Sequence, residues 1–169
     1  MLTIEKNSVK TGRFADTQHV DTLISNYKKE RWAYNSERLG KADSMSTWYS
    51  IEEMEAFLEK AKLHGGDGVR IYFGAYPTDF AEKPEYAGRQ TVVFVATKAK
   101  ETETRGIANK DLYIATENGT SILAYNYTPL CPPYGCPGGK SGTGIAEGDD
   151  WGGIGTTLVD CGDKGMIVV

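Results

Sequence analysis

The chain has 169 residues, which is enough for one ordinary domain with a core of its own. Its hydrophobic fraction of 40% and charged fraction of 25% are typical of a globular protein. Its net charge of -4 disfavours nucleic acid as a partner, because phosphate binding needs a concentrated basic surface. No stretch approaches the ~20 apolar residues of a membrane span, and the N-terminus carries no signal-peptide pattern. We therefore expect a cytoplasmic protein with no membrane partner.

Two helices are expected in the first half of the chain. The first begins at Asp16 or Thr17, whose side-chain oxygen caps a free backbone N–H group, and it ends at Gly40. Its apolar residues recur at helical spacing, with Trp32 beside the stripe, so we expect a core-facing helix that packs on more than one side. The alternative is that this aromatic face binds a partner. The residues at this spacing are Val20, Leu23, Ile24, Tyr27, Arg31 and Tyr34.

The second helix has the clearest local signal. Ser50 and Glu53 form a capping box, in which each side chain accepts a hydrogen bond from the backbone N–H of the other residue. Gly65 and Gly66 end the helix, and His64 in its last turn has a structural explanation, because a cationic ring favours the helix dipole. The expected buried stripe consists of Ile51, Met54, Phe57, Leu58 and Ala61.

Strands follow the helices. Residues 69–76 alternate, which predicts a strand with Arg70 and Tyr72 on the face opposite to its aliphatic residues. Residues 91–97 are apolar at nearly every position, which predicts a central strand covered on both faces. The link over 77–89 is expected to be a long surface loop, where function is often located.

Later segments carry weaker signals. Residues 98–109 are charged and are expected to be exposed. Residues 111–116 and 120–126 flank Glu117-Asn118-Gly119, and an Asn-Gly pair predicts a hairpin because both residues tolerate a positive φ.

The composition changes after Thr128, where the chain becomes rich in glycine and proline. Short strands are expected over 154–159 and 166–169, and Trp151 is one of several apolar anchors that favour docking of this arm on the same domain or on a partner. The predicted fold class is therefore α+β. Two N-terminal helices pack on a mostly antiparallel sheet in a globular domain of residues 1–128, followed by an irregular Gly/Pro-rich C-terminal arm of residues 129–169.

Cys131 and Cys136 leave several interpretations open. Two thiolates four residues apart suit half of a zinc site, which makes zinc a possible cofactor, but no second knuckle supplies the remaining ligands. A disulfide needs an oxidising compartment or a redox role. Redox catalysis usually places its cysteines at a helix N-terminus, which the surrounding prolines and glycines disfavour. The remaining interpretation is structural, with the thiols as small buried side chains beside a stiff extended Pro132-Pro133 segment.

A binding site is the other candidate for chemistry. Arg70 beside Tyr72 and Tyr76 suits a carboxylate or phosphate, although an arginine paired with an internal acid is the favoured explanation. Trp151 is a further candidate binding residue on the arm. No Gly-x-Ser-x-Gly elbow is present and the two histidines form no recognisable triad, so an enzyme is the less favoured class.

Four segments together resemble a group of small bacterial proteins that share an early Asn-Tyr-Arg-like helix, a Gly-Ile-Arg-Ile-Tyr-like strand and a Cys-Pro-Pro-x-Cys-like end. This chain has Asn26-Tyr27-Lys28 in the helix and one extra residue between its two thiols. The resemblance implies an organisation and no activity. The segments are 49–54, 68–77, 90–97 and 131–136, within a similarity that covers about residues 16–136.

We expect a soluble, non-enzymatic module for protein interaction or self-assembly, whose partner is another protein or a second copy of the chain. The alternative is a thiol-dependent protein that binds metal or cycles a disulfide through Cys131 and Cys136.

Overall fold

The computed structural model describes residues 11–102, 106–134, 158–160 and 166–168. The fold is α+β, as predicted, with helices in the first half of the chain and antiparallel pairing in its sheets. None of the described helices is long and apolar enough to cross a membrane. The chain divides into two compact units that interleave in sequence. The first unit is Met1–Val20, Ser50–Tyr72 and Val93–Asn126, and the second is Asp21–Tyr49, Phe73–Val92 and Tyr127–Val169.

The first helical segment runs without a break from α1 (Thr17–Tyr27) through a π-helical turn, η1 (Lys28–Trp32), into α2 (Ala33–Leu39). Asp16 caps it, because its Oδ1 accepts the His19 N–H at 2.8 Å, and Gly40 ends it with a φ of 67°. Both predicted ends are confirmed. The prediction that this helix packs on more than one side is wrong, since none of its residues is buried.

The capping box of α3 (Ile51–Leu63) is confirmed in the first unit. The Ser50 Oγ accepts the Glu53 N–H at 3.1 Å, and Glu53 Oε2 accepts the Ser50 N–H at 2.9 Å. His64 is the C-cap residue, and Gly65 follows with a φ of 78°, which only glycine adopts without strain. The local sequence therefore specifies both ends of this helix.

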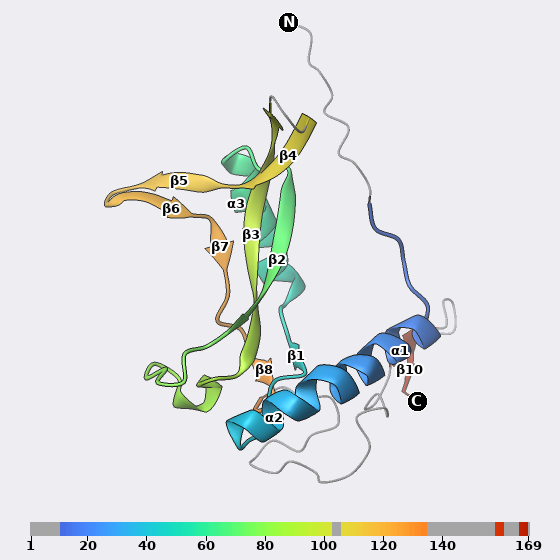
Figure 1. Ribbon diagram of the computed structural model, residues 1–169. Coiled ribbons are helices and arrows are strands. Elements are labelled where there is room, and N and C mark those ends of the chain that lie inside the picture. Colours follow the sequence, from blue (N-terminus) through green and yellow to red (C-terminus); the bar gives the residue numbers. More distant parts are fainter. Residues whose placement is uncertain (1–10, 103–105, 135–157, 161–165, 169) are drawn as a thin grey trace, which may run out of the picture. The chain divides into compact units, whose positions relative to one another are not determined.

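The main sheet has β3 (Gln90–Thr102) at its centre, as predicted. The strand order is β2-β3-β4, with β2 at Gly68–Ala75 and β4 at Gly106–Asp111, and the short β7 (Ala124–Tyr125) also pairs with β3. Figure 1 shows β3 between β2 and β7. All four residues of β3 from 94 to 97 are buried. Residues 98–101 and 106–109 are largely exposed, as expected, but residues 98–102 form the far end of β3 and residues 106–109 most of β4, which the sequence did not indicate.

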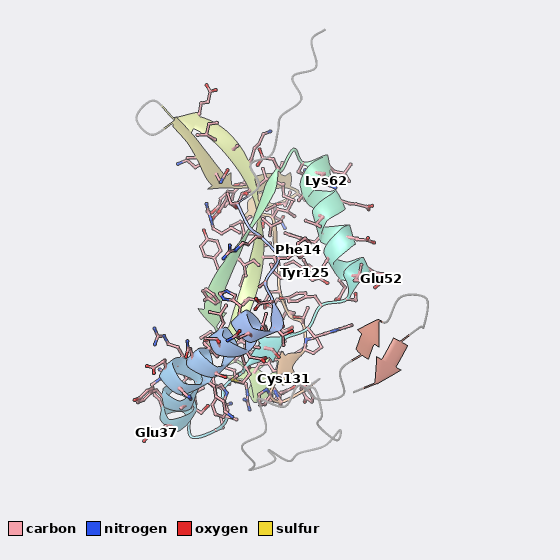
Figure 2. The ribbon with its side chains drawn as sticks, turned by 90° about the vertical axis from the view of Figure 1, so that its right-hand side faces the viewer. Phe14, Glu37, Glu52, Lys62, Tyr125 and Cys131 are labelled. Carbon is pink, nitrogen blue, oxygen red and sulfur yellow. The ribbon has the colours of Figure 1, made fainter. Side chains whose placement is uncertain are left out.

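The core of the first unit lies between α3 and this sheet. The Phe57 ring lies 6.3 Å from Phe94 and 6.0 Å from Tyr125, and Tyr125 donates a hydrogen bond to Glu53 Oε1 at 2.9 Å. Figure 2 shows Tyr125 between the sheet and α3. Of the predicted stripe only Phe57 and Ala61 are buried, so the expected burial of its other three members is wrong.

The predicted hairpin is present as β5 (Tyr113–Thr116) and β6 (Gly119–Ile122), paired from Tyr113↔Ile122 to Thr116↔Gly119. Gly119 has a φ of 123°, whereas Asn118 keeps a negative φ. The turn therefore depends on the glycine and not on two residues with positive φ.

The second unit contains a short sheet of β1 (Ser46–Thr47) and β8 (Leu130–Cys131), with Thr47 opposite Leu130. Leu130 is only 1% exposed, so the first residues of the predicted arm belong to the core of this unit. Pro132 and Pro133 form a turn and not the expected extended segment. The domain boundary predicted at Thr128 stays a prediction, because residues 135–157 lie outside the description.

An aromatic cluster fills the rest of the second unit's core. Tyr76 stacks on Phe80 with ring centroids 4.7 Å apart and also contacts Tyr86, which lies in η2 (Pro84–Tyr86) and is buried. The predicted surface loop over 77–89 is therefore only partly exposed. Near the C-terminus β9 (Leu158–Asp160) pairs with β10 (Met166–Val168). β9 overlaps the end of the expected range 154–159, and β10 lies within the expected range 166–169.

Candidate functional site

The predicted binding residues Arg70 and Tyr72 are occupied by partners within the first unit. Arg70 Nη1 forms an ion pair with Asp111 and donates to the Tyr72 hydroxyl at 3.2 Å, while Nη2 donates to the Asn109 carbonyl oxygen at 2.7 Å. The Tyr72 hydroxyl donates to Asp111 Oδ2 at 2.6 Å. These contacts match the favoured explanation of an arginine paired with an internal acid, and they remove the basis for an anion site here.

The other predicted site residues lie elsewhere. Tyr76 belongs to the second unit, where burial in the aromatic cluster raises the pKa of its phenol and keeps it neutral. Trp151 and Cys136 lie outside the described residues. Cys131 is buried and disulfide-bonded, and the other two cysteines, Cys136 and Cys161, both fall outside the description. Among the described residues no cluster of three or more His, Cys, Asp or Glu side chains is arranged to hold a metal ion.

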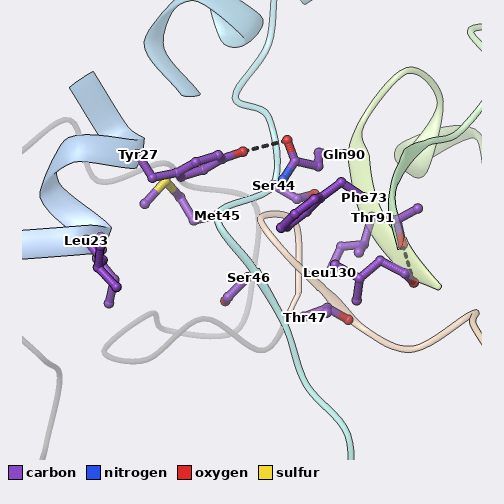
Figure 3. A pocket seen from close by; sticks show the side chains of 12 residues that line it. Leu23, Tyr27, Ser44, Met45, Ser46, Thr47, Phe73, Gln90, Thr91 and Leu130 are labelled. Carbon is purple, nitrogen blue, oxygen red and sulfur yellow. Dashed lines mark hydrogen bonds between the residues drawn. The ribbon is translucent and has the colours of Figure 1, made fainter. Parts of the chain in front are cut away.

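An open apolar groove in the second unit is the strongest candidate site, and Figure 3 shows it from close by. It lies between the helix that carries Leu23 and the strand end that carries Phe73, and its cavity volume is about 280 Å³. Leu130, one of its lining residues, is buried and belongs to the core of this unit. The lining residues are Leu23, Ile24, Tyr27, Ser44, Met45, Ser46, Thr47, Phe73, Gln90, Thr91, Val92 and Leu130.

Local structure explains why apolar side chains gather at this groove. Leu23, Ile24 and Tyr27 occupy one side of α1, because Tyr27 lies four residues after Leu23 and three after Ile24, and residues at these spacings are neighbours on a helix surface. Phe73 lies on the face of β2 opposite to Tyr72, because successive side chains alternate across a strand. Leu23 and Ile24 are exposed and Phe73 is 83% exposed, so the described residues leave this apolar wall uncovered.

The polar groups of the groove are largely engaged. The Tyr27 hydroxyl donates to Gln90 Oε1 at 2.7 Å, and Ser44 Oγ donates to the Pro132 carbonyl oxygen at 3.1 Å. Thr47 Oγ1 shares a hydrogen bond with Thr128 Oγ1 at 2.7 Å. Burial, followed by the nearby Asp43 carboxylate, raises the pKa of Tyr27, so its phenol stays protonated near neutral pH.

Asp43 fixes the position of the polar side of the groove. Its carboxylate is 2% exposed, and Oδ1 accepts the N–H groups of Ser44 at 2.8 Å and Gln90 at 2.7 Å. Its backbone oxygen accepts the Trp32 indole N–H at 2.7 Å. Asp43 therefore joins the helix, the segment before β1 and the start of β3.

Arg89 is the second charged residue buried in this unit, at 7% exposure. Its Nε donates to the Glu85 carbonyl oxygen at 2.7 Å, and its Nη1 has no hydrogen-bond partner among the described residues. Burial lowers the pKa of Arg89, and the Asp43 carboxylate opposes this shift. Sequence reasoning missed both Asp43 and Arg89, because an isolated charged residue in a connecting segment carries no signal of burial.

No family model, curated protein or solved structure matches this chain. The resemblance to small bacterial proteins therefore stays a prediction.

Proposed function

We propose that this chain is a protein-interaction module whose partner inserts an apolar side chain into the groove of the second unit. The observation that carries the proposal is the uncovered apolar wall formed by Leu23, Ile24 and Phe73. Exposed apolar surface of this kind gains free energy when a partner removes it from water.

The size and chemistry of the groove favour a side chain over a cofactor. Its volume of about 280 Å³ lies at the lower limit of the roughly 300–1,000 Å³ of sites for drug-sized ligands. Tyr27 is the only titratable side chain among its described lining residues, and a phenol with a raised pKa is a poor base near neutral pH. These features support binding over acid–base catalysis.

Selection of a random peptide library on the full chain tests the proposal. We expect enriched peptides to share one large apolar residue and to bind the Leu23→Asp variant at least about tenfold more weakly, since burying a leucine-sized side chain contributes ~1.5–3 kcal/mol. Leu63→Asp is the matched control, because Leu63 is also an exposed helical leucine but lies in the first unit. Peptides that bind the Leu23→Asp variant as tightly as the original chain, or a selection that enriches none, would contradict the proposal.

The state of Cys131 bears on the thiol-dependent alternative. A metal ligand or attacking nucleophile must be a thiolate, and a buried, disulfide-bonded cysteine provides none. We therefore rank metal binding or redox cycling through Cys131 and Cys136 second. A count of free thiols in denaturant, without and with reductant, tests this ranking. One thiol before reduction and three after it supports a structural disulfide, whereas three thiols before reduction restore the alternative.

The same disulfide bears on the expected compartment. Disulfides persist in oxidising compartments and are rare in the cytoplasm of mesophiles. The cytoplasmic location expected from the sequence is therefore disfavoured by Cys131.

A further inference from the structure

Strand β2 lies at an edge of the main sheet. Within the described part of the chain it pairs only with β3, and its other side faces no strand, as Figure 1 shows. An edge strand presents unpaired N–H and C=O groups, which are a template for another strand.

The usual protection of such an edge is missing from β2. Proteins block an edge with lysine, proline or a strand too short to pair, but β2 has eight residues, no lysine and no proline. Its side chains at Val69, Ile71 and Phe73 share one face, and Ile71 is 53% exposed. The opposite edge strand, β4, carries Lys110 next to its last residue and is protected in the ordinary way.

Contacts along β2 show which backbone groups point outward. Gly68 lies opposite Thr97 of β3, and Gly74 lies opposite Thr91. Just beyond β2, the Tyr76 N–H donates to the Arg89 carbonyl oxygen at 3.0 Å. All three pairings belong to the same antiparallel register. Even-numbered residues therefore bond to β3. The N–H and C=O groups of Val69, Ile71 and Phe73 point to the open edge, because hydrogen-bonding direction alternates along a strand.

The one charge on β2 does not obstruct the edge. Arg70 reaches Asp111, which is opposite Thr97 in the β3–β4 pairing. The Phe94 ring contacts Phe57 of α3, so Phe94 lies on the face of β3 that α3 covers. Thr97 is three residues further along the strand and therefore lies on the opposite face. The Arg70 guanidinium is therefore held over the face of the sheet that α3 does not cover, where it pairs with the Asp111 carboxylate.

We propose that two copies of the chain pair through β2 in antiparallel orientation, about a two-fold axis at Ile71. This register is self-complementary. It places Val69 of one copy opposite Phe73 of the other on one face, and Arg70 opposite Tyr72 on the other face. Apolar pairs and arginine–aromatic pairs are both favourable across strands, and no like charges meet. The interface continues the sheet from one copy into the next through the β2 backbone, and its residue Phe73 also lines the groove proposed above.

Cross-linking tests the register directly. In this pairing the two Cα atoms of residue 71 are about 5.5 Å apart, as in a hydrogen-bonded antiparallel pair, which is within the range of a disulfide. Ile71→Cys should therefore form a covalent dimer under mild oxidation. Val69→Cys should not, because its two copies are offset by four residues, or about 14 Å. The unsubstituted chain controls for the native cysteines. Equal cross-linking of the two variants, or none of Ile71→Cys, would overturn the register.

Sedimentation velocity tests the association itself. We expect the full chain to form a concentration-dependent dimer and Ile71→Lys to weaken it at least about tenfold, because an edge lysine is the device that blocks strand pairing. Leu63→Lys adds the same charge at an exposed leucine outside the sheet and should dimerise normally. Leu23→Asp should also dimerise, so a failure of the groove proposal remains distinguishable from a failure of this one. A chain that stays monomeric at every concentration, or an Ile71→Lys dimer of unchanged strength, overturns the pairing.

Discussion

Replacing Asp43 with alanine removes a single acceptor that holds two segments of the second unit together. The carboxylate Oδ1 accepts the backbone N–H of Ser44 at 2.8 Å and that of Gln90 at 2.7 Å. Asp43 is 2% exposed, so water does not readily replace the lost oxygen. Each N–H group is then left without an acceptor, that of Ser44 at a buried position and that of Gln90 at a partly buried one.

The magnitude follows from the cost of unsatisfied donors. A buried donor without a partner costs about 1–3 kcal/mol, so Asp43→Ala should lower the free energy of unfolding by about 2–6 kcal/mol. Asp43→Asn keeps a side-chain oxygen in the same place and should cost less than half as much. The asparagine variant loses only the negative charge that opposes the lowering of the Arg89 pKa by burial.

Urea unfolding followed by tryptophan fluorescence measures this difference. Trp32 is a suitable reporter because its indole donates to the backbone oxygen of Asp43. Asp67→Ala is the control, since the Asp67 carboxylate also accepts a backbone N–H, that of Ala99 at 3.0 Å, but at an exposed position. A loss below about 0.5 kcal/mol for Asp43→Ala, the range of ordinary surface substitutions, would refute the reasoning. Equal losses for the alanine and asparagine variants would show that the charge matters and the acceptor does not.

Three further predictions concern stability. Hydrogen bonds from the Ser50 backbone N–H, first, and from the Tyr125 hydroxyl lower the pKa of Glu53. This carboxylate therefore contributes stability that is fully present above its ordinary pKa and is lost as the pH falls through the lowered pKa. Glu53→Gln should therefore flatten the acid side of a plot of unfolding free energy against pH, and an unchanged slope would contradict this. Phe57→Ala should cost about 3–5 kcal/mol in urea unfolding, because it removes a buried ring from the first unit; a cost below 1 kcal/mol would contradict its place in the core. Gly88→Ala should lower the melting temperature, because Gly88 has a φ of +72° and a Cβ would lie 2.7 Å from a Leu39 methyl group. An alanine in this conformation costs about 1–2 kcal/mol before any clash, and an unchanged melting temperature would contradict the geometry.

Helix ends were predictable because their signals are local. A cap needs only a side-chain oxygen within three residues of a free N–H, and Asp16 and Ser50 both provide one. Gly40 ends its helix because a left-handed residue is needed at that position. Neither device depends on the rest of the chain.

The far half of the β3–β4 pair was not predictable in this way. Residues 98–102 and 106–109 include few apolar side chains and several charged or polar ones such as lysine, glutamate and asparagine, which are depleted in strands. They form strands because β3 is already in the sheet, and antiparallel pairing from Thr97↔Asp111 to Thr102↔Gly106 satisfies the backbone. Such long-range hydrogen bonding overrides a weak local preference.

Burial was the other limit of the sequence. Periodicity correctly placed Leu23 and Ile24 on one helix face, and Ile51 and Leu58 on another, but all four side chains are exposed. A hydrophobic pattern shows which residues share a face and does not show whether another element covers that face. The groove was not predictable from the helix alone, because Phe73 and Leu130, which are far from the helix in sequence, also line it.

The two proposals together predict a bivalent assembly. Two copies joined at Ile71 carry two grooves, so a peptide with two apolar anchors on a long Gly/Ser linker binds its second anchor at high effective concentration. The dimer should bind the bivalent peptide at least about tenfold more tightly than the monovalent one. Ile71→Lys should keep the monovalent affinity and lose this gain, because each monomer offers one groove. Isothermal titration of both peptides measures the two affinities. A gain that survives in the Ile71→Lys variant would mean that strand pairing does not bring the grooves together.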